Sequence, residues 1–430
     1  MIMEVKMKRL FLYSLLLFLC PLFISAQWLE TTIRVKNWPV ALVYNPTNNK
    51  IYCANLHDDS VTVIDGATNS VITTIAVDDQ PNGLAHNPVN NEVYCANSGD
   101  HTMTIIDGIT DSVIKTIAAG DWPWNMVYNP ITNKIYCVNF FGDNVSVLDC
   151  ALDTFITTIP VGDFPWGLGF NPTNNKIYCS NIESANVTVI DGAADTVIAT
   201  ITTGSQPLFL VHNPTNNKVY CSNGYSNNVT VIDGAADTVI ATIAVGIEPY
   251  DLVYHPSYNK IYCTNETSDN VSVIDCDTDS VIKTIAVGNQ PYALAYNPFN
   301  NKIYCANFSS NNISVINCSI DTVIATIAVG EFPCAFAWNP IQNRTYVANN
   351  NSASVSVLRD VSEIEENGSA NILLPYYSPT IFNGPPKLPK GRTCRVFDIM
   401  GRVVMTDMMK PGIYFIEIDG KISQKVIKVR

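Results

Sequence analysis

The chain has 430 residues, of which 47% are hydrophobic and 15% charged, so it is a globular protein with room for two or three domains and not a disordered chain. Its 25 basic and 38 acidic residues give a formal net charge of -13. This charge argues against nucleic acid as a partner, because binding to a phosphate backbone requires a basic surface.

The first residues have the pattern of a secretory signal peptide. Residues 6–9 carry three positive charges, residues 10–19 form an apolar run, and small residues precede Gln27. The run is shorter than the ~20 apolar residues that span a bilayer. We therefore predict a signal peptide over residues 1–26, no transmembrane anchor after its cleavage, and an exported protein that is secreted or at the outer cell surface. An uncleaved anchor is the alternative.

The body of the chain is a repeat of 42 residues that never slips in register. Each unit contains four short runs rich in β-branched and aromatic residues, as at residues 83–87, 92–97, 102–107 and 112–118, separated by Asn, Gly, Asp and Pro. Four antiparallel strands per repeat is the pattern of a β-propeller blade. The repeat is marked by eight equally spaced prolines: Pro39, Pro81, Pro123, Pro165, Pro207, Pro249, Pro291 and Pro333.

The two ends of the repeat region predict how the ring closes. The last unit, from Pro333 to about Asp360, contains three runs and no fourth, whereas residues 29–35 align with residues 71–77 at an offset of one repeat. The N-terminal strand is therefore expected to complete the last blade, which also removes exposed sheet edges at the seam. We predict an all-β fold, a closed β-propeller of eight four-stranded blades over residues 27–360. A seven-bladed ring with one displaced unit is the alternative.

Several segments resemble a known repeat family. Residues 51–55 (Ile-Tyr-Cys-Ala-Asn), 61–65 (Val-Thr-Val-Ile-Asp) and 346–349 (Tyr-Val-Ala-Asn) are similar to the Tyr-Val-Thr-Asn (YVTN) propellers, and the resemblance extends over about residues 28–360. The resemblance implies the propeller fold. Its members resemble surface-layer and other exported binding propellers as well as some enzymes, so it leaves the activity open.

Comparison of the eight units separates a constant face from a variable face. The loops between first and second strands and between third and fourth strands are nearly uniform, whereas the loops between second and third strands differ in every blade. The variable face also receives the loops that lead into each first strand. Nine aromatic residues near these entry loops, at the expected mouth of a central channel, are the candidate ligand-binding residues: Trp38, Trp122, Trp124, Phe164, Trp166, Phe209, Tyr250, Tyr292 and Phe332. Packing of these rings between blades, and a catalytic pocket, are the alternatives.

The sequence predicts no cofactor. Acidic residues assigned to the variable loops, among them Asp100, Asp251 and Glu266, leave Ca²⁺ possible as a ligand, but no loop has the dense alternation of Asp typical of a calcium site. The few histidines form no cluster with metal-ligand spacing, and no catalytic sequence motif is present. His86 and His212 occupy a repeat position that is otherwise aromatic.

Seven of the thirteen cysteines occupy the same position in successive blades. Stacked sheets lie about 10 Å apart, whereas a disulfide needs Cα atoms within about 7 Å. These cysteines are therefore expected to be free and buried in the place of a small apolar residue: Cys53, Cys95, Cys137, Cys179, Cys221, Cys263 and Cys305.

Beyond the repeats, residues 361–376 have the composition of a linker, and residues 377–430 predict a small antiparallel, β-sandwich-like domain. Within it, residues 397–404 (Phe-Asp-Ile-Met-Gly-Arg-Val-Val), the Gly-Ile-Tyr at 412–414 and a terminal Lys-Val-Ile-Lys-Val resemble the C-terminal sorting domain of type IX secretion substrates. That resemblance implies the type IX secretion machinery as a partner. An ordinary β accessory domain is the alternative.

Together these features predict an exported binding protein that recognises a glycan, a peptide or a surface protein on its variable face. A structural surface-layer component is the first alternative. A lyase or hydrolase housed in the propeller is the second, although no blade stands out in the sequence as carrying matched catalytic groups.

Overall fold

The computed structural model describes residues 27–360, 380–382, 394–398, 412–418 and 421–428. These residues fold as β-strands with one short 3-10 turn, η1 (Asn350–Ser352), and contain no α-helix. The chain divides into two compact units, one up to Glu366 and one from Asn367. Among the described residues, no helix has the length and apolarity to cross a membrane. The predicted signal peptide and linker lie outside the described residues.

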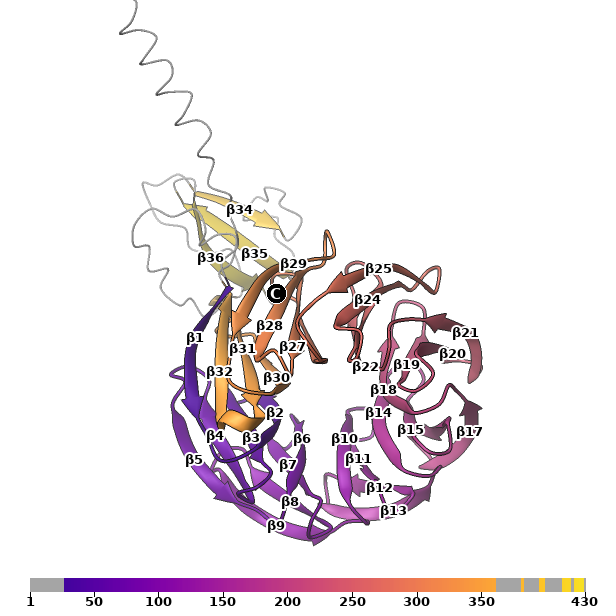
Figure 1. Ribbon diagram of the computed structural model, residues 1–430. Coiled ribbons are helices and arrows are strands. Elements are labelled where there is room, and N and C mark those ends of the chain that lie inside the picture. The colour runs from indigo at the N-terminus through magenta and orange to yellow at the C-terminus, as the bar shows by residue number, and fades with distance from the viewer. Residues whose placement is uncertain (1–26, 361–379, 383–393, 399–411, 419–420, 429–430) are drawn as a thin grey trace, which may run out of the picture. The chain divides into compact units, whose positions relative to one another are not determined.

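The first unit is a ring of eight four-stranded antiparallel blades (Figure 1). The innermost strands are β2 (Pro39–Asn45), β6 (Pro81–Asn87), β10 (Pro123–Asn129), β14 (Pro165–Asn171), β18 (Pro207–Asn213), β22 (Pro249–His255), β26 (Pro291–Asn297) and β30 (Pro333–Asn339). The second strands are β3 (Lys50–Asn55), β7 (Glu92–Asn97), β11 (Lys134–Asn139), β15 (Lys176–Asn181), β19 (Lys218–Asn223), β23 (Lys260–Asn265), β27 (Lys302–Asn307) and β31 (Arg344–Asn349). We number the blades 1 to 8 in this order.

The third strands are β4 (Ser60–Asp65), β8 (Thr102–Asp107), β12 (Asn144–Asp149), β16 (Asn186–Asp191), β20 (Asn228–Asp233), β24 (Asn270–Asp275), β28 (Asn312–Asn317) and β32 (Ser354–Asp360). The outermost strands are β5 (Val71–Ala76), β9 (Ser112–Ala118), β13 (Thr154–Pro160), β17 (Thr196–Thr202), β21 (Thr238–Ala244), β25 (Ser280–Ala286), β29 (Thr322–Ala328) and β1 (Gln27–Arg34).

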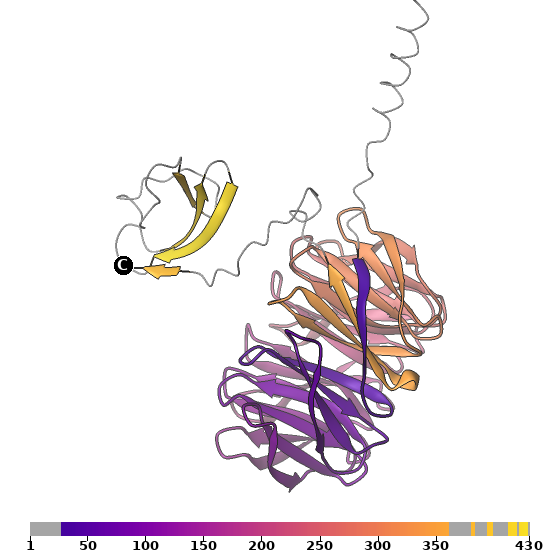
Figure 2. The same cartoon turned by 90° about the vertical axis from the view of Figure 1, so that its left-hand side faces the viewer.

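The N-terminal strand closes the ring. β1 pairs antiparallel with β32, so blade 8 has the order β1-β32-β31-β30 and joins the two ends of the propeller. Figure 2 shows the indigo β1 lying beside the orange strands of this last blade. The prediction of eight blades is confirmed, and the seven-bladed alternative is wrong.

The core lies between neighbouring blades. Each hydrophobic cluster joins the middle strands of one blade to those of the next, as where Tyr136 and Val147 of blade 3 meet Ile177 and Cys179 of blade 4. The repeated cysteines are free and fully buried, as predicted, and Cys150, Cys276 and Cys318 are also free and buried. A small apolar side chain fits these positions because the facing sheets leave little space.

The constant face carries a second repeated connection between blades. Lys218 Nζ lies 2.6 Å from an Asp279 carboxylate oxygen in the next blade, and the buried Tyr220 hydroxyl donates to the same carboxylate at 2.8 Å. The same lysine to aspartate pair recurs at four other junctions: Lys50–Asp111, Lys134–Asp195, Lys176–Asp237 and Lys260–Asp321. The uniform Lys and Asp of the sequence repeat therefore hold blades together on the face opposite the variable loops.

The second unit contains one four-stranded sheet in the order β33 (Thr380–Phe382), β36 (Lys421–Lys428), β35 (Gly412–Ile418), β34 (Cys394–Asp398). Two of its pairings are antiparallel, as the sequence predicts, but β33 pairs parallel with β36. The described strands thus form a single mixed sheet, whereas the sequence predicted an antiparallel, sandwich-like domain.

Candidate ligand-binding face

The loops of the variable face are only half variable. In seven of the eight loops between second and third strands, the third residue accepts a hydrogen bond from the loop that enters its own blade, as Ser184 Oγ does from Asp163 N at 2.7 Å; blade 3 has Gly142 at this position. In six loops the fourth residue accepts one from the entry loop of the next blade, as Asp143 Oδ1 does from Phe164 N at 3.0 Å; the other two loops have Ala185 and Ala353 there. Several loop carboxylates are therefore structural acceptors, and the freely varying positions are the first two of each loop.

The residue before each innermost strand has a positive φ between 51° and 60° in all eight blades, although none of these residues is glycine. This left-handed conformation is costly for bulky side chains. In six blades the fourth loop residue supports it through the hydrogen bond just described, for example by His101 Nδ1 accepting from Trp122 N at 2.9 Å. Four blades place an aromatic side chain at this position: Trp38, Trp122, Phe164 and Phe332.

The structure assembles a first aromatic cluster over blades 3 and 4. Trp124 and Trp166 lie side by side with ring centroids 5.2 Å apart, and Phe140 touches both Phe164 (5.1 Å) and Trp166 (5.8 Å). The exposed Phe141 contacts Trp122 at 5.3 Å. Four of the predicted residues are thus brought together. The cluster also includes Phe140 and Phe141, which the sequence analysis did not single out because they belong to one of several variable loops.

A second aromatic cluster runs over blades 5 to 8. Tyr250 and Tyr292 are 4.4 Å apart, Phe209 packs edge-on against Tyr250 at 5.0 Å, and Phe308 links Tyr292 to Phe332. The Tyr250 hydroxyl donates to the Tyr292 hydroxyl at 2.6 Å. All of these rings are partly exposed. Phe308 is the member that was missed, because it stands in a loop whose other residues are Ser and Asn.

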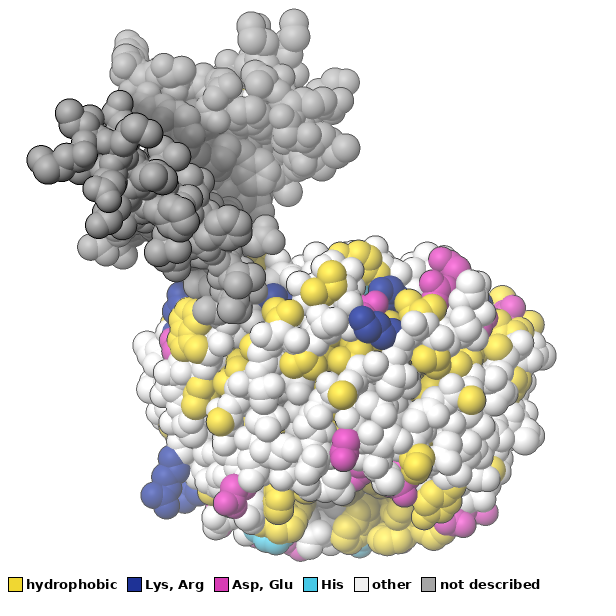
Figure 3. All heavy atoms as spheres, turned by 45° about the horizontal axis from the view of Figure 1, so that its top comes forward, with side chains coloured by type: hydrophobic (Ala, Val, Ile, Leu, Met, Phe, Trp, Pro, Cys, Tyr) yellow, Lys and Arg dark blue, Asp and Glu magenta, His cyan; other side chains and the backbone are white. Residues whose placement is uncertain are grey.

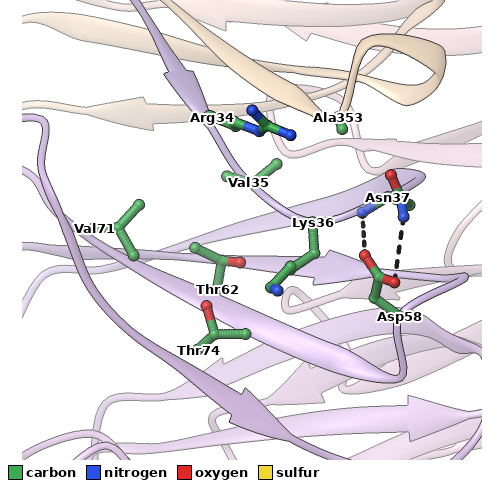
Figure 4. Close-up of a pocket in the computed structure, with 9 residues that line it drawn as sticks. All are labelled: Arg34, Val35, Lys36, Asn37, Asp58, Thr62, Val71, Thr74 and Ala353. Carbon is green, nitrogen blue, oxygen red and sulfur yellow. Dashed lines mark hydrogen bonds between the residues drawn. The ribbon is translucent and has the colours of Figure 1, made fainter.

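Trp38 lies apart from both clusters. Its ring stacks on His57 with centroids 4.1 Å apart, and the pair lines a cavity of about 420 Å³ beside Asn350. A second cavity of about 490 Å³ lies at the seam between blades 8 and 1, lined by Lys36, Thr62 and Thr74 among others, and none of the nine predicted aromatic residues lines it (Figure 4). The Asp58 carboxylate at its edge binds the backbone and side chain of Asn37.

Asp251 corrects one interpretation of the sequence. It is not a loop residue with a solvated charge but part of the innermost strand β22, next to Tyr250. Its carboxylate accepts the Leu294 N–H of blade 7 at 2.7 Å and the Leu252 N–H at 2.8 Å. Burial raises the pKa of the Asp251 carboxyl to about 7. The other seven blades carry Ala, Gly, Asn or Phe at this position, so blade 6 does break the symmetry of the ring.

Two glutamates extend this acidic region. Burial, followed by the charge of Glu248, raises the pKa of Glu266, and Glu266 and Asp251 contribute to the raised pKa of both tyrosines. Within residues 27–360, no lysine or arginine forms an ion pair with Asp251, Glu248 or Glu266. The region therefore combines two tyrosine rings with three carboxyl groups and no neighbouring cation.

Metal-binding geometry is absent from the part of the chain that the structure describes, where no three His, Cys, Asp or Glu side chains are placed to hold an ion. His86 and His212 each bind the Asn five residues later, as Tyr44 and Tyr128 do, which confirms the shared aromatic position. A carboxyl group with a pKa near 7 beside a tyrosine pair can act as an acid or a base, and among the described residues it belongs to no group of side chains placed to hold a metal.

The ring and its loop face define the class of the protein, a closed eight-bladed β-propeller. Residues 240–364, fewer than a third of the chain, match a family described as lactonase, 7-bladed β-propeller. Among solved structures, a chain of Kuenenia stuttgartiensis hydrazine synthase is similar, with a TM-score of 0.55 and 22% identity over 68% of this chain and 98% of that chain. At this identity the similarity shows the fold alone. No curated protein matches the chain significantly.

Proposed function

We propose that the chain is an exported β-propeller binding protein that holds a glycan, a peptide or a surface protein on its variable face. The observation that carries this proposal is the gathering of eleven aromatic rings into two clusters around one end of the propeller. Rigid aromatic side chains supply large contact areas at a low entropic cost, which is why they dominate binding surfaces.

Packing between blades accounts for Trp124, which lies against the core between blades 3 and 4, but not for a ring as exposed as Phe141. The buried interblade core is built mainly by the second and third strands, and Phe141 is 51% exposed. The indole Nε1 of Trp166 is buried without a hydrogen-bond partner among the described residues, so no structural hydrogen bond explains this tryptophan. Trp122 carries its ring on a backbone with φ 60°, a conformation that is costly for a bulky side chain.

The experiment is a binding screen of the full chain on glycan and peptide arrays, with and without Ca²⁺. The triple variant Trp122→Ala, Trp124→Ala, Trp166→Ala should lose at least about tenfold in affinity, because each ring contributes on the order of 1 kcal/mol or more. Phe299→Ala is the matched control, since Phe299 is exposed on the constant face. Unchanged affinity of the triple variant at unchanged thermal stability would refute the proposal.

A structural surface-layer role is the second candidate, favoured by the rim of the ring. The outermost strands expose pairs of β-branched residues, at 40–48% each, along edges whose backbone groups are unpaired: Val71, Ile72, Val113, Ile114, Ile156, Val197, Ile198, Val239, Ile240 and Ile282. Figure 3 shows hydrophobic side chains distributed over the outer wall. Such edges invite lateral pairing with further copies.

Lateral assembly is tested by concentration-dependent sedimentation and electron microscopy of the full chain. Ile198→Lys with Ile240→Lys should dissolve any assembly, since lysine on an edge strand opposes pairing and two blades already carry it at Lys115 and Lys283. A monomer at all concentrations would remove this candidate.

Export and sorting are proposed from the terminal segments. Residues 1–26 would direct the chain out of the cytoplasm, and residues 377–430 would engage the type IX secretion machinery. Removal of residues 377–430 should leave the propeller inside the cell envelope, whereas the full chain reaches the medium or the outer surface. Equal distribution of the two in cell fractions would exclude the sorting role.

A further inference from the structure

The negative charge of the protein is concentrated on the variable face. The loops of this face, taken as the four residues before each innermost strand and the four after each second strand, carry thirteen carboxylates and a single lysine, Lys36. The carboxylates are Asp58, Asp59, Asp78, Asp79, Asp100, Asp121, Asp143, Asp163, Glu183, Glu248, Glu266, Asp269 and Glu331. On the opposite face, by contrast, five aspartates are paired with lysines.

The carboxylates repel one another locally. Burial, then the charges of Asp59 and Asp100, raise the pKa of Asp79. A face with this charge attracts cations and repels phosphates, sulfates and acidic sugars over distances of about the Debye length, ~10 Å in dilute salt. The same property favours a cationic partner over a neutral one.

The second aromatic cluster offers a place for one cationic group. Tyr250 and Tyr292 form a tilted pair of rings 4.4 Å apart, beside Asp251 on the same strand and Glu266 in the adjoining loop. Aromatic faces attract ammonium and guanidinium groups, and this attraction strengthens when a carboxylate completes the charge balance. No cation of the described chain occupies this position.

We propose that the partner held by the variable face is a basic polypeptide, with a lysine or arginine side chain bound between the Tyr250–Tyr292 pair and the carboxyl groups of Asp251 and Glu266. This inference rests on the proposed binding function and narrows its ligand class. A polypeptide fits better than a small cation, because the charge and the two aromatic clusters extend over most of the ring.

The test uses the full chain on an array of peptides of graded lysine and arginine content. Each basic peptide has a neutral partner in which lysine is acetylated and arginine is replaced by citrulline, so that shape is retained and charge is removed. Basic peptides should bind at least about tenfold more tightly than their neutral partners, and their affinity should fall by about tenfold between 50 and 500 mM salt.

Two variants locate the cationic group. Glu266→Gln and Tyr292→Leu should each weaken binding of the best basic peptide by about fivefold or more. Glu266→Gln should do so with an unchanged melting temperature, and Tyr292→Leu is measured with its melting curve, since Tyr292 also accepts the Tyr250 hydroxyl. Asp277→Asn is the matched control, because Asp277 is an exposed acid of the constant face whose acceptor role toward Asn259 an amide can keep. Asp251→Asn is measured with its melting curve, since Asp251 also accepts two backbone hydrogen bonds.

The outcomes separate this inference from the broader proposal. Binding to neutral glycans or neutral peptides that depends on the aromatic rings but not on salt would overturn the basic partner and leave the binding function standing. Equal binding of charged and neutral peptide partners would overturn it as well. No binding on either the glycan array or the peptide array would overturn both the basic partner and the binding function.

Discussion

Glu92 of blade 2 faces Asp153 of blade 3 across their junction. At the equivalent place in five other junctions, a lysine faces an aspartate. The Tyr94 hydroxyl lies between the two carboxyl groups, 2.7 Å from Glu92 Oε2 and 3.1 Å from Asp153 Oδ1. Burial and then the charge of Asp153 raise the pKa of Glu92 to about 7, although the hydrogen bond from Tyr94 acts in the opposite direction. One junction of the constant face thus lacks its cation.

Glu92→Lys should stabilise the propeller by about 1 kcal/mol, because it replaces a repulsive contact with the partly buried ion pair present at the other junctions. The midpoint of thermal unfolding should rise by about 2 °C. The reciprocal change Lys134→Glu creates a second acid pair with Asp195 and should lower the midpoint. A lower midpoint for Glu92→Lys would contradict this account.

The pH dependence of stability carries the signature of Glu92. Its folded pKa is about 7, above the usual value of 4.5, so the folded state binds this proton more tightly than the unfolded state. Its stabilising contribution is complete below about pH 4.5 and is lost as the pH rises through 7. Compared with Glu92→Gln, the natural chain should therefore lose stability between pH 5 and pH 8 in unfolding by urea. Parallel pH profiles of the two proteins would exclude this contribution of Glu92.

His255 is expected to make stability depend on pH in the opposite direction. Seven junctions join an asparagine at this repeat position to an asparagine of the next blade, as Asn213 Nδ2 donates to Asn259 Oδ1 at 2.8 Å, but neither ring nitrogen of the buried His255 has a partner among the described residues. Burial lowers the pKa of His255, so its contribution to stability is present above about pH 6.5 and is lost as the pH falls. Two charged neighbours, Lys260 and Asp321, act on it with opposite signs.

His255→Asn should restore the missing hydrogen bond and raise stability by about 1 kcal/mol at pH 7. Between pH 7 and pH 5 it should also reduce the acid-induced loss of stability. Asn213→His is the control that moves the defect to another junction. If His255→Asn melts lower than the natural chain at pH 7, the histidine is performing a role that asparagine cannot.

The seam of the ring depends on one buried pair. Arg344, with a side chain only 8% exposed, binds the Glu30 carboxylate of β1 at 2.5 Å and the carbonyl oxygens of Gly66 and Ala67 in blade 1. Glu30→Gln leaves the buried guanidinium without its charge partner and should cost about 2 kcal/mol. The change Arg34→Gln, at an exposed position of the same strand, should be nearly neutral in the same thermal unfolding measurement. Equal effects of the two would argue against the pair.

The repeated cysteine position should accept valine. Cys137 is fully buried, its thiol pKa is raised to about 12 by burial, and blade 8 carries Val347 at the equivalent position. Cys137→Val should change stability by less than about 1 kcal/mol, and the repeated cysteines should resist alkylation in the native state. Rapid labelling of these thiols under native conditions, followed by mass spectrometry, would show that the interblade core opens.

Repetition made most of the fold predictable. A position such as Asn139 recurs in every blade because its side chain binds Asn144 and Ser146 of the neighbouring strand, and Lys134 recurs because it holds Asp195. Residues that are repeated for a structural reason can be recognised in a single sequence, because each blade can be compared with the other seven. The eight-bladed count followed in the same way from the displaced fourth strand.

The sequence alone also located the side of the ring where variation gathers, but it did not show which residues meet there. Phe140 joins Trp166, and Tyr250 joins Tyr292, across distances of 26 and 42 residues, because only closure of the ring sets neighbouring blades side by side. The sequence alone predicted Asp251 to be a charged loop residue. In the structure it lies in strand β22, and its carboxyl group accepts a hydrogen bond from the next blade. The period of the chain therefore determined the architecture and its constant contacts, while the encounters of unrepeated side chains, and so the chemistry of the binding face, were decided by tertiary structure.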